Sequence, residues 1–142
     1  MASVHLTLAN RMEELPRLDR EAAAFLETVG ASPAAGYAVS LALEELVTNI
    51  IKYGYDDMAG HEIGVDLAWD GGALRLTVRD DGHHFDPLTA PPPDLELSVE
   101  DRPIGGLGLH LVRQFFPDVR YRRENDGNVL ELCRPADCDR AG

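Results

Sequence analysis

Apolar and polar residues alternate at the start of the chain, where Val4, Leu6 and Leu8 occupy every second position. A period of two is the pattern of a strand that buries one of its faces. We therefore expect an edge strand to open the fold.

The next two segments have the spacing of helices. Over residues 11–29 apolar side chains recur every three or four positions until Gly30 ends the run, and Pro16 lies either in the first turn or at a break. Ser32 and Pro33 form a typical helix start, an N-cap followed by proline at the first helical position. The second helix is predicted to end near residue 52 or 53.

Two hairpins are predicted in the second half of the chain. Strands at residues 62–69 and 73–79 flank the turn Asp70-Gly71-Gly72, and strands at 119–123 and 129–133 flank Asp126-Gly127. Between the hairpins, residues 105–116 have helical spacing, and residues 135–142 read as a tail.

The segment 83–104 shows no periodicity and contains consecutive prolines at 91–93. A loop of this length inside a compact domain is usually either a lid over a binding site or a disordered segment.

Composition and charge narrow the class of protein. The chain has 142 residues, 44% hydrophobic and 27% charged, which fits one soluble domain spanning residues 1–142. No apolar run approaches the ~20 residues that cross a bilayer, and residues 1–10 lack the features of a secretory signal, so we expect a cytoplasmic protein. The net charge of -12 disfavours nucleic acid and anionic lipid as partners. Cys133 and Cys138 match neither a zinc site nor a redox dithiol, and we interpret them as reduced thiols.

The second helix has one face for the core and another for chemistry. The apolar stripe expected to face the core consists of Val39, Leu43, Leu46, Val47 and Ile50. Glu45, Thr48, Asn49 and Lys52 project to nearly the opposite side, where a carboxylate and an amide four residues apart can address one ligand. The alternative is an ordinary solvated helix face.

Asp80 continues the buried parity of the strand that contains Leu74, Leu76 and Val78. A buried carboxylate needs a donor, and the exocyclic amino group of an adenine would supply one, with Gly82 leaving room for the ring. The alternative is an Asp-Asp-Gly turn in which Asp80 caps its own backbone.

A glycine cluster precedes the last predicted helix. In Gly105-Gly106-Leu107-Gly108 the amides at the helix start would cradle a phosphate, although such a cluster can also be a flexible hinge. The chain contains neither a P-loop motif nor the motifs of eukaryotic-type kinases.

Taken in order, three motifs resemble the conserved boxes of the gyrase, chaperone, histidine-kinase and mismatch-repair ATPase superfamily, which has the Bergerat fold. They are Glu45-Leu-Val-Thr-Asn49, Asp80-Asp-Gly82 and Gly106-Leu-Gly108. The longer stretches 44–55, Phe85-Asp86-Pro87 and 102–109 resemble the anti-sigma-factor serine kinase branch of that superfamily, and the resemblance covers residues 33–134.

The resemblance implies an α/β two-layer sandwich, with a mixed, mostly antiparallel sheet, helices on one face and ATP held under a lid at about 83–104. It also implies roles for single residues. Asn49 would bind Mg²⁺ through its side-chain oxygen, Glu45 would be the general base, and Asp80 would fix adenine. Lys52 lies on the Glu45 face, where it would neutralise phosphate charge or simply be a surface lysine.

Some positions depart from the family pattern. Kinases of this branch place an arginine close to the second glycine box, and the nearest one here is Arg102, separated from the box by Pro103 and Ile104. We interpret His83 and His84 as exposed loop residues rather than metal ligands, and Glu44 as a structural or surface carboxylate.

The implied function is an ATP- and Mg²⁺-dependent protein serine/threonine kinase that phosphorylates an anti-anti-sigma partner of the STAS type and so regulates a sigma factor. Homodimerisation is a further expectation from the family. The main alternative is an ATP-binding regulatory protein that sequesters a partner without kinase activity. A histidine-kinase catalytic domain is disfavoured because a chain of this length has no room for a phosphoacceptor helix pair.

Overall fold

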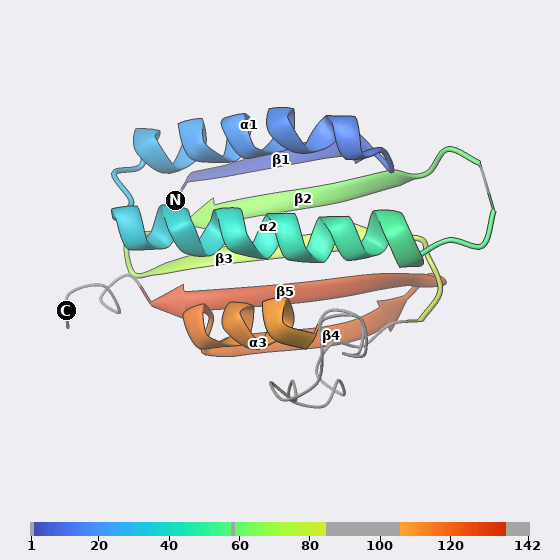
Figure 1. The fold of residues 1–142 in the computed structure, drawn as a ribbon. Helices are drawn as coiled ribbons and strands as arrows, with labels where there is room; N and C mark the ends of the chain where they lie inside the picture. The colour runs from blue at the N-terminus through green and yellow to red at the C-terminus, as the bar shows by residue number, and fades with distance from the viewer. Residues whose placement is uncertain (1, 58, 85–105, 136–142) are drawn as a thin grey trace.

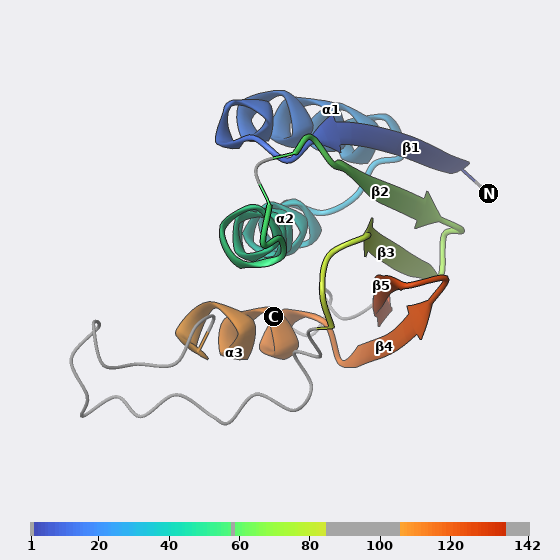
Figure 2. The ribbon, with the colours of Figure 1, turned by 90° about the vertical axis from the view of Figure 1, so that its right-hand side faces the viewer.

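The computed structural model describes residues 2–57, 59–84 and 106–135. Helices and a single sheet form two layers, with the helices gathered on one face of the sheet (Figures 1 and 2). The strands are β1 Ala2–Ala9, β2 Glu62–Trp69, β3 Ala73–Asp80, β4 Asp118–Glu124 and β5 Gly127–Pro135. The helices are α1 Leu15–Thr28, α2 Pro33–Tyr53 and α3 Gly106–Phe115, with a short 3-10 turn at Met12–Glu14.

The sheet has the strand order β1-β2-β3-β5-β4, and each of its four pairings is antiparallel. The expected two-layer α/β sandwich is therefore confirmed, although the sheet of the described residues is antiparallel throughout rather than mixed, and β1 is an edge strand as its pattern predicts. Because β3 lies at the centre, its end is flanked by the start of β5, and the register places Asn128 opposite Asp80.

Helix α2 lies over the middle of the sheet, between α1 and α3 (Figure 1). It begins where the sequence predicts, since the Ser32 hydroxyl accepts a hydrogen bond from the Ala35 amide and Pro33 occupies the first turn. The predicted stripe does face the core: Val39, Leu43, Leu46 and Val47 are buried, and Ile50 packs at its border. Each such buried side chain contributes roughly 1.5–3 kcal/mol.

Length and mean hydropathy alone would allow α2 to cross a membrane, which the sequence reading did not anticipate. In this structure its apolar residues pack on α1, α3 and the sheet, as those of a core helix do.

The helical pattern at 11–29 is divided into the 3-10 turn and α1, and Pro16 lies in the first turn of α1. Arg17 joins these pieces, because its guanidinium donates hydrogen bonds to the carboxylates of Glu14 and Glu21 and to the carbonyl of Thr7 in β1. Gly30 follows the helix with a φ of 73°, a conformation that favours glycine.

Two predicted boundaries need correction. The β4–β5 turn is formed by Asn125 and Asp126, which both have positive φ as in a type I′ hairpin, and not by Asp126-Gly127. Gly127 already belongs to β5, where a Cβ would come within 2.5 Å of the Asp80 carbonyl oxygen. Strand β5 extends through Pro135, so the predicted tail begins one residue later; its remainder and positions 85–104 of the predicted lid lie outside the described residues.

Candidate functional site

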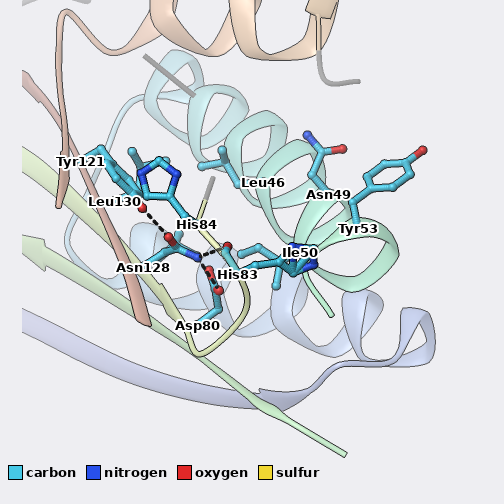
Figure 3. A pocket seen from close by; sticks show the side chains of 12 residues that line it. Leu46, Asn49, Ile50, Tyr53, Asp80, His83, His84, Tyr121, Asn128 and Leu130 are labelled. Carbon is cyan, nitrogen blue, oxygen red and sulfur yellow. Dashed lines mark hydrogen bonds between the residues drawn. The ribbon is translucent and has the colours of Figure 1, made fainter. Parts of the chain in front are cut away.

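A cavity of about 240 Å³ lies between the second half of α2 and the adjoining ends of β3, β4 and β5 (Figure 3). Most of its wall is apolar, and polar side chains enter from different elements. Helix α2 and its C-cap contribute Leu46, Asn49, Ile50, Tyr53 and Gly54. Strand β3 and the residues after it contribute Val78, Asp80, His83 and His84, and the last two strands contribute Tyr121, Asn128 and Leu130. An apolar slot with a few convergent polar groups suits a flat heteroaromatic ligand.

Asp80 is the last residue of β3, is half-buried and lines this cavity. Its Oδ1 atom accepts hydrogen bonds from the Gly82 amide at 2.8 Å and from the Asn128 side-chain nitrogen at 3.0 Å. Asp80 therefore caps the backbone of its own turn through Gly82 and also lines the cavity, two roles that the sequence analysis treated as alternatives. Burial raises the pKa of Asp80, and the hydrogen bonds from Asn128 and Gly82 act in the opposite direction.

Glu45 and Asn49 are joined along one face of α2, because the Asn49 amide nitrogen donates to the Glu45 carboxylate at 3.2 Å. Both side chains are half-buried. The sequence predicts that Asn49 lies nearly opposite the apolar stripe of α2. In the structure Asn49 lines the cavity together with Leu46 and Ile50 of that stripe, so it lies at the border of the stripe. The bond uses the amide nitrogen of Asn49 and so directs the amide oxygen away from Glu45.

Other candidates on this helix lie away from the cavity. Lys52 is exposed and is not part of the cavity wall, and Glu44 is exposed as expected.

Gly82 has a packing reason to be glycine that the sequence did not reveal. It is buried and does not line the cavity, and a Cβ on it would overlap the carbonyl oxygen of Gly54. The same carbonyl accepts a hydrogen bond of 2.9 Å from the His83 amide. The residue therefore allows the chain after β3 to pack against the end of α2, and the expectation that it leaves room for a ligand ring stays a prediction.

The two histidines after Gly82 are exposed, as predicted, and both line the cavity, which was not predicted. His84 meets the ring of Tyr121 edge-on, with ring centroids 5.4 Å apart. His83 lies 3.5 Å from the carboxylate of Asp56.

The glycine-rich motif is only partly covered by the structure. Gly106, Leu107 and Gly108 form the first turn of α3, which confirms that the glycines open a helix. Arg102 and Gly105 lie outside the described residues, and their roles stay predictions.

Sequence reasoning missed the contribution of the last hairpin, namely Tyr121, Asn128 and Leu130. These residues reach the cavity because β5 pairs with β3, and strands distant in the sequence give no local sign of such pairing. A hint was available in Asn128, a polar residue directly before the apolar residues Val129 and Leu130.

An acidic strand end and a helix with a Glu–Asn pair at one cavity, with a glycine-started helix packed against that first helix, define a class, the nucleotide-binding ATPase domains of the histidine-kinase type. Residues 8–134 match the family model of the histidine kinase-like ATPase domain, and the chain belongs to this family. Membership implies ATP binding and confirms the family resemblance carried by the three motifs.

Three proteins that are similar in sequence to this chain have names of the anti-sigma kinase branch. Serine/threonine-protein kinase BtrW of Bordetella bronchiseptica is 29% identical over 96 residues, which cover 68% of each chain. Anti-sigma F factor of Anoxybacillus flavithermus is 27% identical over 104 residues, covering 68% of this chain and 66% of that protein. Serine-protein kinase RsbW of Bacillus cereus is 29% identical over 96 residues, covering 65% of this chain and 59% of that protein.

A solved structure has the same fold. It contains the RsbU and RsbW domains of a Mycobacterium tuberculosis protein and superposes with a TM-score of 0.61 at 20% sequence identity. The match covers 95% of this chain and 34% of the larger protein.

Proposed function

We propose that this chain is a cytoplasmic protein serine/threonine kinase of the anti-sigma type. It uses ATP and Mg²⁺ to phosphorylate an anti-anti-sigma partner of the STAS type, and thereby regulates a sigma factor by partner switching. The observation that supports this function best is that Asn49, which is hydrogen-bonded to Glu45, lines the same cavity as Asp80. The kinase and anti-sigma names of the relatives point the same way.

In this function the adenine ring lies in the cavity with its amino group toward Asp80, between the apolar walls from α2 and the sheet. The phosphates then extend toward Asn49 and the glycine-started helix α3, whose first amides and dipole favour negative charge.

The residues fit a bound Mg²⁺ ion. Asn49 donates to Glu45 with its nitrogen, which leaves its oxygen, a hard ligand, for the metal. The ion would neutralise charge on the β- and γ-phosphates.

Glu45 is the general base of this reaction. Its carboxylate accepts the proton of a partner serine or threonine hydroxyl while the hydroxyl oxygen forms a bond to the γ-phosphorus. The bond from that phosphorus to the oxygen bridging the β-phosphate breaks in line, ADP leaves, and the proton remains on Glu45. Asn49 holds the carboxylate in position through the 3.2 Å hydrogen bond.

A phosphotransfer assay tests the kinase. Transfer of the γ-phosphate to a purified STAS-type protein is measured for wild type, Glu45→Gln and Glu44→Gln. We expect Glu45→Gln to bind Mg²⁺-ATP normally and to lose about 100-fold or more in transfer rate, because a general base contributes 10²–10⁴-fold. Glu44→Gln, one residue away on the exposed surface, serves as the matched control and keeps the wild-type rate. Undiminished transfer by Glu45→Gln would exclude Glu45 as the base.

The second candidate function is sequestration of a partner by an ATP-bound protein without phosphate transfer. It needs the cavity and Asp80 but not Glu45. If ATP binds and promotes partner binding equally in wild type and Glu45→Gln, and no phosphate moves in either, this function replaces the kinase.

A further inference from the structure

Asn128 is the most highly connected side chain of the cavity and is only 7% exposed. Its amide nitrogen donates to Asp80 Oδ1 at 3.0 Å and to the carbonyl oxygen of His83 at 2.9 Å. Its amide oxygen accepts from the hydroxyl of Tyr121 at 2.5 Å and from Nη1 of Arg123 at 3.1 Å. Figure 3 shows the amide between Tyr121 on one side and Asp80 and His83 on the other. The side-chain amide of Asn128 therefore donates two hydrogen bonds through its nitrogen and accepts two at its oxygen.

The chemistry of these partners allows one orientation of the amide. A guanidinium group only donates, so Arg123 must face the amide oxygen, while a carbonyl oxygen and a carboxylate only accept, so His83 and Asp80 must face the nitrogen. Arg123 is itself fixed, since Nη1 also donates to the Gly82 carbonyl at 3.0 Å and Nη2 to the Asp126 carbonyl at 3.1 Å. Asn128 therefore presents an N–H donor to Asp80 that cannot turn into an acceptor.

The hydrogen bond from Asn128 gives the two carboxylate oxygens of Asp80 different roles. Both protein hydrogen bonds to the carboxylate end on Oδ1, and within the described part of the chain none ends on Oδ2. Two donors on one oxygen fix the rotation of the carboxylate and favour its ionised form. Oδ2 is then left as an acceptor for a ligand in the cavity that Asp80 lines.

We propose that Asn128 is the positioning residue for nucleobase selection, which acts by holding Asp80 as a fixed, acceptor-only group for the 6-amino group of adenine. The proposal rests on the proposed function insofar as the ligand is an adenine nucleotide. A purine with a 6-oxo group would meet lone pair against lone pair at Oδ2, and a purine without a 6-substituent would leave it unpaired.

The prediction concerns a ratio of affinities. Calorimetry on the full chain with Mg²⁺ compares ATP with purine riboside triphosphate, which lacks the 6-amino group and is otherwise the same. In wild type we expect ATP to bind roughly 10- to 100-fold more tightly, the range for a hydrogen bond to a charged group. In Asn128→Ala the affinity for ATP falls toward that of the analogue, the affinity for the analogue changes little, and the ratio approaches one.

A double-mutant cycle separates positioning from general structural support. With Asp80→Asn in the background, Asn128→Ala should have little further effect on the ATP-to-analogue ratio, because its effect passes through the Asp80 carboxylate. A purely structural role would lower binding of both nucleotides by the same factor in either background.

A second variant, with a side chain of the same shape, tests the proposal in case Asn128→Ala does not fold. Asn128→Asp keeps the shape and the acceptor for Tyr121 and Arg123 but removes the donor to Asp80. At pH 8 we expect the ATP-to-analogue ratio to collapse in this variant as well, and thermal unfolding shows whether each variant is folded.

The outcomes distinguish this proposal from the function on which it rests. If wild type binds ATP with the expected preference and the folded variants keep that preference, Asn128 does not position Asp80 and only this proposal is wrong. If wild type does not bind ATP, the proposed function fails first and the proposal with it.

Discussion

Asp80→Asn is expected to weaken ATP binding and, at the same time, to stabilise the nucleotide-free protein. The substituted side chain can keep an oxygen at the Oδ1 position, where it still accepts from the Gly82 amide and the Asn128 nitrogen. The nitrogen at the other position then faces the cavity with a donor in place of an acceptor. For ATP this removes a charge-assisted hydrogen bond of about 1.5–3 kcal/mol, which is roughly a 10- to 100-fold loss of affinity.

The effect on stability follows from the pKa of Asp80, which burial raises above its ordinary value. A carboxyl whose pKa is higher in the folded state binds its proton more tightly there than in the unfolded chain. Its ionisation therefore lowers the free energy of unfolding as the pH rises from the unfolded pKa through the folded pKa, and the loss persists at neutral pH. Asparagine avoids that loss, so Tm of the nucleotide-free variant at pH 7.5 should be higher than that of wild type.

Asp81→Asn is the matched control, because Asp81 is exposed and does not line the cavity. It lies 3.1 Å from His61, so its replacement should lower Tm and leave ATP affinity unchanged. Calorimetry with Mg²⁺-ATP and thermal unfolding without nucleotide are measured on wild type and both variants. The reasoning is refuted if Asp80→Asn binds ATP as tightly as wild type, or if it lowers Tm as Asp81→Asn does.

Two further predictions concern the segments around the site. His61 bridges Asp57 and Asp81, which raise its pKa, so the stability it contributes is fully present below the unfolded pKa of His and is lost as the pH rises through the folded pKa. Tm of wild type should fall across that window, and His61→Asn should show a flatter profile; equal profiles would rule the bridge out. Gly82→Ala should lower the free energy of unfolding in urea by about 1–3 kcal/mol, since its Cβ would overlap the Gly54 carbonyl. Gly60→Ala, with open space around it, is the control, and equal effects of the two substitutions would contradict the packing argument.

The elements could be predicted from the sequence because each is encoded locally. Apolar spacing, the Ser32-Pro33 start and the Asp70-Gly71-Gly72 turn are properties of neighbouring residues, and the structure confirms the elements they predict. The polar residues Glu45 and Asn49 could be related to each other for the same reason, as they lie one turn apart on one helix.

The cavity wall could not be predicted in full, because it depends on which strands become neighbours. The pairing of β3 with β5 spans a long stretch of sequence, and it alone brings Asn128 opposite Asp80. The close approach of Gly82 to Gly54 is of the same kind, since it joins the end of β3 to the end of α2. The sequence therefore could not reveal that packing against Gly54 also requires a glycine at position 82.

Both candidate functions need the cavity and Asp80, and they differ in whether they need Glu45. In either function Asp80 would bind adenine and Asn128 would hold Asp80 in position, so variants at these positions cannot distinguish a kinase from a sequestering protein. Glu45 touches neither the ring pocket nor Asp80 and is joined only to Asn49 among the described side chains. A loss of phosphate transfer without a loss of ATP affinity on changing Glu45 therefore identifies a catalytic group, whereas a loss of both would mean that the carboxylate serves to hold Asn49 in place for nucleotide binding.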